Sequence, residues 1–108
     1  MRFALLDVET TGDRPGRDDI IQVGIAIVDG DGGNFAVERT YSSFVRPRGP
    51  IPAHITALTG ITDEMTAGAP EPDDVVNDIL PLLDGAALVA HQAAFDLAFL
   101  EEALAGAG

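Results

Sequence analysis

Two carboxylates stand at the end of the first apolar segment of this chain, in the run Leu5-Leu6-Asp7-Val8-Glu9. Side chains alternate along a strand, so Asp7 and Glu9 project from one face, about 7 Å apart along the backbone. Such a pair repels itself unless a positive group joins it, and a divalent cation such as magnesium or manganese suits its oxygen atoms. Two solvated acids at a strand end are the alternative. The next residues, Thr10-Thr11-Gly12, predict a tight turn whose N–H groups face an anion.

A third carboxylate, Asp96, lies in the first turn of an apolar helix predicted over Ala93–Ala105. An acid there complements the helix dipole, which explains Asp96 taken alone. If the strand before this helix pairs in parallel with the first strand, all three carboxylates meet at the carboxyl edge of the sheet. Open α/β folds place their sites at that edge. Three converging acids beside His91 suit a metal-assisted hydrolase.

The elements that must position these residues form an alternating pattern of strands and helices. We expect strands where short apolar runs rich in β-branched residues occur, namely Phe3–Val8, Ile20–Val28, Phe35–Val45 and Ala86–Ala90. We expect helices over Pro52–Leu58, ended by Gly60, and from Pro72 or Asp73 to Gly85, with Pro81 kinking or shortening the latter. Ala67–Pro72 is a predicted loop.

This order predicts an α/β fold with a mixed sheet. The turn Asp29–Gly33 joins the second and third strands into an antiparallel pair. The first three strands therefore form an antiparallel meander, and the fourth lies parallel to the first, with helices flanking the sheet.

Composition restricts the class of protein. The 108 residues suffice for one domain, 46% of them are hydrophobic, and none is cysteine, so disulfides and thiolate metal sites are excluded. No apolar run is long enough for a membrane span, and no signal peptide opens the chain, so we expect a cytoplasmic protein without membrane contact.

The net charge of −12 argues against a nucleic-acid partner, because proteins that grip phosphates normally carry a basic surface. The charge is uneven, however: residues 1–48 hold all six arginines, and residues 49–108 hold none. Arg14, Arg17, Arg46 and Arg48 are candidates to steer a phosphate strand, with plain solvated side chains as the alternative. For His54 we expect an exposed or packing role.

The motifs together resemble a known family. Asp7-Val8-Glu9-Thr10-Thr11-Gly12 and His91-Gln92-Ala93-Ala94-Phe95-Asp96-Leu97-Ala98-Phe99-Leu100 look like the first two motifs of the DEDD (DnaQ-like) 3′–5′ exonucleases. This family includes the epsilon proofreading subunit of bacterial DNA polymerase III and exonuclease domains fused to helicases. Leu58-Thr59-Gly60-Ile61-Thr62-Asp63 resembles the family segment that touches the substrate end.

The resemblance implies an RNase H-like fold and two magnesium or manganese ions about 3.5–4 Å apart. It implies that Asp7, Glu9 and Asp96 are the catalytic metal ligands. It implies hydrolysis of nucleic acid from the 3′ end, in DNA proofreading or repair. The implied partners are the 3′ end of single-stranded DNA, or of RNA, and a polymerase or helicase in the same assembly or chain. The implied substrate contacts come from Thr10, Thr11, Gly12, Leu58, Thr59, His91, Gln92 and Phe95.

Two departures from the family pattern matter. Gln92 stands where the family usually has asparagine, which tunes the pocket. The third motif, a histidine or tyrosine base followed by a fourth aspartate, is absent from residues 1–108. His91 and Asp96 mimic its spacing, but Asp96 already serves the second motif, so we expect His91 to line the pocket.

We therefore expect residues 1–108 to be the N-terminal part of a single exonuclease domain, C-terminally incomplete. For this chain we expect weak metal binding and little or no turnover. We also expect exposed apolar surface on the last helix. The alternative is a catalytically incomplete RNase H-like module that binds nucleic acid or serves a structural role.

Overall fold

The computed structural model of the chain describes residues 1–90 and 92–107. Its elements follow the order expected from the sequence, with one added helix. The strands are β1 (Arg2–Thr10), β2 (Ile20–Asp31), β3 (Asn34–Phe44) and β4 (Ala87–Ala90). The helices are α1 (Ala53–Thr59), α2 (Asp63–Ala67), α3 (Pro72–Leu83) and α4 (Ala93–Ala107).

The four strands form one mixed sheet in the order β3-β2-β1-β4. β2 pairs with β1 and with β3 in antiparallel fashion, and β4 pairs with β1 in parallel. The predicted meander with a parallel fourth strand is therefore confirmed. Gly32 and Gly33 take positive φ angles of 59° and 91° at the hairpin tip, which lets β3 turn back directly on β2.

Alternation along β1 decides which face becomes the core. Ala4, Leu6 and Val8 are buried beside the β2 side chains Val23 and Ile25. The intervening residues of β1 face the opposite side of the sheet. Asp7 and Glu9 belong to that opposite set, so the strand that anchors the core also presents two carboxylates away from it.

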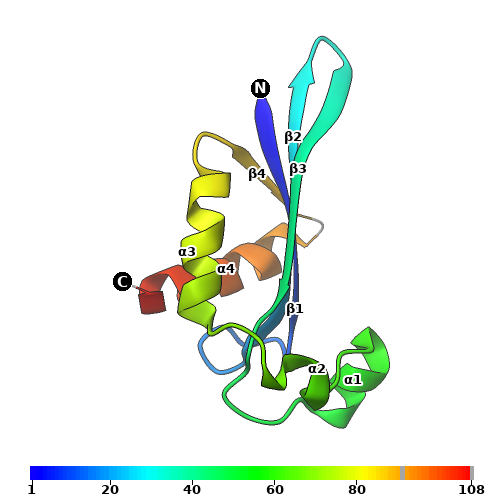
Figure 1. Ribbon diagram of the computed structural model, residues 1–108, viewed down its shortest axis with the longest axis vertical. Helices are drawn as coiled ribbons and strands as arrows, with labels where there is room; N and C mark the ends of the chain where they lie inside the picture. Colours follow the sequence, from blue (N-terminus) through cyan, green and yellow to red (C-terminus); the bar gives the residue numbers. More distant parts are fainter. Residues whose placement is uncertain (91, 108) are drawn as a thin grey trace.

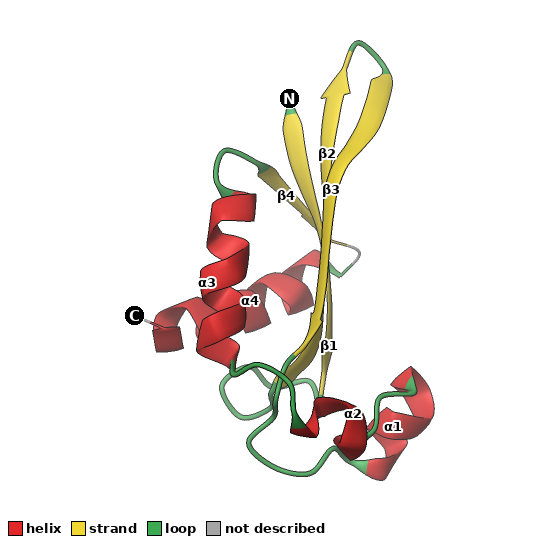
Figure 2. Cartoon of the chain, in the orientation of Figure 1, coloured by secondary structure: helices red, strands yellow, loops and turns green. Residues whose placement is uncertain are grey.

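The helices cover the two faces of the sheet unequally (Figure 1). α3 and α4 lie together over the core face, while α1 and α2 lie on the other side, near the carboxyl end of β1 (Figure 2). A second small core fixes α1 there: Ile55 of the helix packs with Ile21, Ile51 and Ile61, and Phe44 packs against the cluster. The rest of that face, toward the hairpin tip, has no helix over it.

Three details differ from the sequence-based expectations. α2 was not predicted, although Thr62 caps it by accepting a hydrogen bond from the Met65 amide at 3.2 Å. α3 continues through Pro81 and ends two residues later, just before Gly85 with its φ of 73°. The expected exposed apolar surface on the last helix is not found: none of the large apolar side chains described on α4 is exposed, and Phe99 and Leu100 are buried.

Large apolar side chains are exposed elsewhere, mainly on the strands. β1 and β4 expose Leu5, Leu88 and Val89, and β3 exposes Phe35 and Val37. Unequal cover explains most of them, because α3 and α4 shield only one face of the sheet. Leu88 is the exception: it pairs with the buried Ala4, on the covered face, and is exposed on the edge strand β4. Among the described residues, no helix is both long and apolar enough to cross a membrane.

The contact between α3 and the sheet should carry much of the stability. Ile79 is 1% exposed in the main core, whereas the next residue, Leu80, is 46% exposed. We expect Ile79→Ala to lower the free energy of unfolding by about 2–5 kcal/mol, because it leaves a cavity. Leu80→Ala should cost less than about 1 kcal/mol. Urea denaturation measures both, and equal losses would contradict this account of the core.

Candidate active site

The carboxylates of β1 stand on the less covered face of the sheet. Asp7 is exposed and Glu9 is partly buried. In the β1–β2 ladder, Asp7 lies opposite Gly24 and Glu9 lies opposite Gln22. Because Gly24 has no side chain, nothing on the neighbouring strand covers the Asp7 carboxylate. The alternation predicted for this pair is confirmed by the strand geometry.

The parallel strand brings the third carboxylate to the same end of the sheet. The β1–β4 register ends where Leu6 pairs with Ala90, one residue before Asp7. α4 begins three residues later, and the Asp96 amide donates a 2.9 Å hydrogen bond to the Gln92 carbonyl in its first turn. The Asp96 residue is only 3% exposed.

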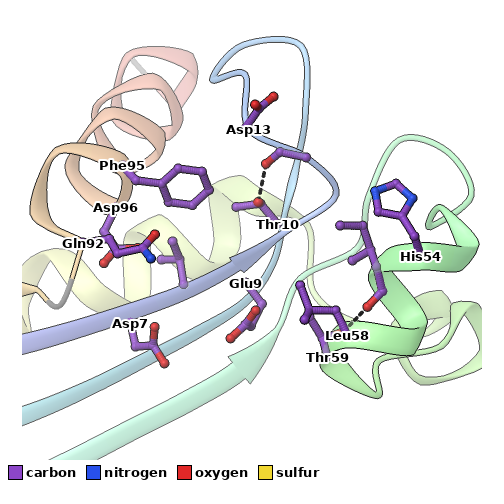
Figure 3. A pocket seen from close by; sticks show the side chains of 13 residues that line it. Asp7, Glu9, Thr10, Asp13, His54, Leu58, Thr59, Gln92, Phe95 and Asp96 are labelled. Atoms are coloured by element: carbon purple, nitrogen blue, oxygen red, sulfur yellow. Dashed lines mark hydrogen bonds between the residues drawn. The ribbon is translucent and has the colours of Figure 1, made fainter.

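A single pocket of about 620 Å³ brings the predicted residues together. Asp7, Glu9 and Asp96 line it. Figure 3 shows Asp7 and Glu9 on one side of β1, with Asp96 and Gln92 on the side of α4. The other predicted residues that line it are Thr10, Gly12, Leu58, Thr59, Gln92 and Phe95.

The three carboxylates interact electrostatically. Burial raises the pKa of Glu9, and the negative charges of Asp7 and Asp96 raise it further, in that order. A carboxyl in this position is harder to ionise than one in water, because two like charges and partial desolvation oppose its charge. A cation in the pocket would remove this penalty.

The donor set suits a hard divalent cation, since it consists of carboxylate oxygens. The side chains do not enclose a cation in this arrangement. Within residues 1–90 and 92–107, no three histidine, aspartate or glutamate side chains are placed to hold an ion together. Asp7 and Glu9 lie across β1 from Asp96 (Figure 3). The chemistry of the residues therefore fits a metal, and ligation requires the carboxylates to draw closer.

α1 forms the opposite wall of the pocket. Leu58 lines the pocket there and is 80% exposed. The Thr59 hydroxyl donates to the Ile55 carbonyl at 2.8 Å and accepts from the Ile61 amide at 3.1 Å. Thr59 thus shapes the end of α1, and Leu58 offers an apolar surface to whatever enters the pocket.

The turn after β1 closes one end of the pocket. The Thr10 hydroxyl donates to the Gly12 carbonyl at 2.5 Å, which holds the turn tight. A Cβ atom on Gly12 would lie 2.4 Å from a carboxylate oxygen of Asp18, so a larger residue here would force the Asp18 side chain to move. Thr11 points elsewhere: its hydroxyl accepts from the Asp19 amide at 2.9 Å, and it lines a neighbouring hollow.

Two polar residues of the pocket were not predicted. His54 of α1 and Asp13 both line the pocket, and both are exposed (Figure 3). The exposed position expected for His54 is confirmed. Its spacing from Leu58, four residues along a helix, was the available signal. His91, expected to line the pocket, lies outside the described residues.

Comparison with known proteins gives a consistent result. A family model described as an exonuclease, RNase T, matches residues 5–107. The 3′-5′ exonuclease DinG of Bacillus subtilis is 38% identical over 108 residues, covering 99% of this chain and 11% of that protein. A PolC-type DNA polymerase III of Caldanaerobacter subterraneus is 38% identical over 99 residues, covering 92% of this chain and 7% of that protein. The chain thus spans about a tenth of the length of these relatives.

Solved structures support the fold. Exonuclease I in its product-bound form superposes with a TM-score of 0.86 at 17% identity, covering 98% of this chain and 25% of that one. Exonuclease X in complex with 5′ overhanging duplex DNA superposes with a TM-score of 0.63 at 33% identity, covering 90% of this chain and 52% of that one. The RNase H-like fold implied by the sequence is therefore confirmed.

The electrostatic coupling of the carboxylates can be measured directly. We expect Asp7→Asn to lower the pKa of Glu9, because the substitution removes a neighbouring negative charge. That pKa should stay above its usual value, since burial is the largest cause of the shift. NMR titration of the Glu9 side chain without metal provides the measurement. Asp13→Asn, in the same pocket, is the matched control and should leave the Glu9 pKa in place; an equal effect would contradict the assignment.

Proposed function

This chain belongs to the RNase T family of exonucleases, and on that premise we propose that its pocket binds and hydrolyses the 3′ end of a nucleic-acid strand. The observation that carries the proposal is the convergence of Asp7, Glu9 and Asp96 on one pocket. An open pocket with an acidic floor and an exposed apolar side chain on its wall suits the end of a polymer. We propose 3′–5′ hydrolysis of single-stranded DNA, with RNA as a possible substrate, in proofreading or repair.

Asp7, Glu9 and Asp96 are the residues proposed to hold magnesium or manganese. When bound, the metal supplies a positive charge that stabilises the phosphate in the transition state and lowers the pKa of water. The protein's own contribution is to hold three carboxylates in one pocket. The raised pKa of Glu9 supports this assignment, because burial and the nearby negative charges of Asp7 and Asp96 disfavour its ionised form, and a cation would offset both.

The remaining pocket residues are proposed to orient the substrate. Thr10 and Gly12 form the turn that faces the terminal nucleotide, and the Thr10 hydroxyl fixes that turn. Leu58 and Phe95, from opposite walls, provide apolar surface for the terminal base. Gln92 offers an amide at the same edge. Thr11, Thr59 and His91 complete the set taken from the resemblance to the family.

The relatives suggest a setting for this activity. By their names, one is a 3′-5′ exonuclease and another is a DNA polymerase III. We propose that this chain likewise works beside a polymerase or helicase, in the same assembly or the same polypeptide. We also propose that residues 1–108 carry the first two of three family motifs, as one part of an exonuclease domain.

One observation favours a second candidate, a module that binds nucleic acid without cleaving it. Within residues 1–90 and 92–107, no three histidine, aspartate or glutamate side chains are arranged to hold a metal ion together. A binding module would retain the pocket and its affinity for 3′ ends and release no nucleotides. The same assay separates the two candidates.

We expect the chain with magnesium or manganese to shorten 5′-labelled single-stranded DNA stepwise from its 3′ end, slowly because the third motif is absent. Asp7→Asn should reduce the rate at least about 100-fold, since it removes a proposed metal ligand. Asp13→Asn makes the same charge change in the same pocket and should retain the rate. Gel electrophoresis resolves the products. Binding without shortening would favour the second candidate, and loss of label from the 5′ end would exclude both.

Metal binding should also be visible as stability. With manganese at ten times its dissociation constant, we expect about 1.4 kcal/mol of stabilisation, because the ion binds only the folded chain. This corresponds to a rise in the melting temperature of about 5–10 °C. Asp7→Asn should abolish the rise and Asp13→Asn should keep it, as followed by thermal denaturation. An equal rise in both variants would place the ion elsewhere.

A further inference from the structure

A second hollow lies directly beside the pocket. Its volume is about 500 Å³, and Thr11, Arg17, Arg48 and Pro52 are among the residues that line it. Neighbouring residues of the same segments line the two cavities. Thr10 and Gly12 line the pocket, and Thr11, which lies between them in the sequence, lines the hollow. Likewise Pro52 lines the hollow, and His54, two residues later, lines the pocket. The same two chain segments therefore border both cavities, which places the hollow next to a polymer whose end fills the pocket.

The loop that forms the hollow, residues 11–19, is held in one conformation by its own hydrogen bonds. The Thr11 amide donates to the Asp19 carbonyl at 2.8 Å, and the Asp19 amide donates back to the Thr11 hydroxyl at 2.9 Å. The Asp18 carboxylate accepts from the Arg14 amide at 3.0 Å. These bonds close the loop at its base and across its middle.

Arg48 fixes the loop from outside. Its Nε atom donates to the Asp19 carboxylate at 2.8 Å, and its terminal nitrogen donates to the Arg17 carbonyl at 3.0 Å. The same carboxylate accepts from the Arg48 amide at 2.7 Å. Arg48 is thus a positioning residue: its charge is balanced by Asp19, and its effect is to hold the backbone of Arg17.

Arg17 differs from most arginines of the chain. Arg2, Arg46 and Arg48 each form an ion pair with a carboxylate. Within the described part of the chain, the side chains of Arg14, Arg17 and Arg39 form no ion pair, and of these only Arg17 lines the hollow. The hollow contains two arginines and two aspartates, Asp18 and Asp19, so it is neutral in a chain of net charge −12.

We propose that this hollow is a binding site for the phosphodiester backbone of the substrate, upstream of the 3′ end, with Arg17 as the contact. The proposal rests on the proposed function, because it requires a strand whose end occupies the pocket. A guanidinium matches a phosphate in geometry and charge. An arginine held by an ordered loop loses less entropy on binding than one on a mobile segment.

The test is fluorescence anisotropy with thymidine oligonucleotides that end in a phosphorothioate linkage, measured in magnesium over a range of salt concentrations. For a dodecanucleotide, we expect Arg17→Ala to weaken binding about three- to fivefold at low salt. The slope of log affinity against log salt should fall by about 0.7, the value for one lost phosphate contact. A dinucleotide fills only the pocket, so Arg17→Ala should bind it with the same affinity as the wild-type chain.

Arg39→Ala is the matched control, because it removes the same charge from an exposed, unpaired arginine on β3. Arg39→Ala should leave the slope of log affinity against log salt at its wild-type value. Arg17→Lys, which keeps the positive charge, should also show the wild-type slope. If Arg17→Ala and Arg39→Ala behave alike while the wild-type chain binds the dodecanucleotide, this inference is overturned and the proposed function stands. If the wild-type chain binds neither oligonucleotide, both are overturned. Equal melting temperatures of the variants would show that any loss of binding does not come from impaired folding.

Discussion

The short parallel ladder between β1 and β4 is the constraint on which the site depends. Among the described residues it spans four pairs, from Phe3 with Ala87 to Leu6 with Ala90. Because Ala90 pairs with the residue just before Asp7, the chain leaves β4 beside the carboxylates and starts α4 nearby. A slip of one residue would invert the faces of β4 and displace the start of α4. The buried contacts of Phe99 and Leu100 hold α4 in the matching position.

In this arrangement, repulsion among the carboxylates opposes folding. Bringing Asp7, Glu9 and Asp96 to one pocket disfavours the ionised form of Glu9, as its raised pKa reports. The fold tolerates the cluster because Asp7 remains exposed and Gly24 opposite leaves it uncovered. A protein selected for stability alone would avoid such a site, since one neutral side chain in place of Glu9 would relieve it. The cluster is therefore better explained by the metal site that we propose than by structural need.

The sequence was sufficient to predict the four strands and to place Asp7 and Glu9 together, because these rest on local signals. The order of the strands, which brings Asp96 to the same pocket, followed from general rules for chain connections, and Asp13 was missed. Alternation placed Asp7 and Glu9 on one face, and apolar runs identified the four strands. The position of His54 was not predictable in the same way, because it depends on how α1 packs through Ile55 onto Ile21 and Phe44. The separate place of Thr11 depends on a hydrogen bond to Asp19, eight residues away. The exposed apolar surface was assigned to the wrong element, since sequence alone did not show which face of the sheet is left uncovered.

The net charge of −12 argues against a nucleic-acid partner, but its distribution changes that conclusion. The five acidic residues of α3 and α4 other than Asp96 lie over the face of the sheet opposite to Asp7 and Glu9 (Figure 1). Charges separated by more than about 8 Å of salt solution are largely screened, and the molecule measures 45 × 31 × 25 Å. A phosphate strand bound as proposed would therefore respond mainly to nearby groups: the pocket carboxylates, which a cation would neutralise, and Arg17 of the neighbouring hollow. Local balance of charge, rather than the total, decides whether such a strand can bind.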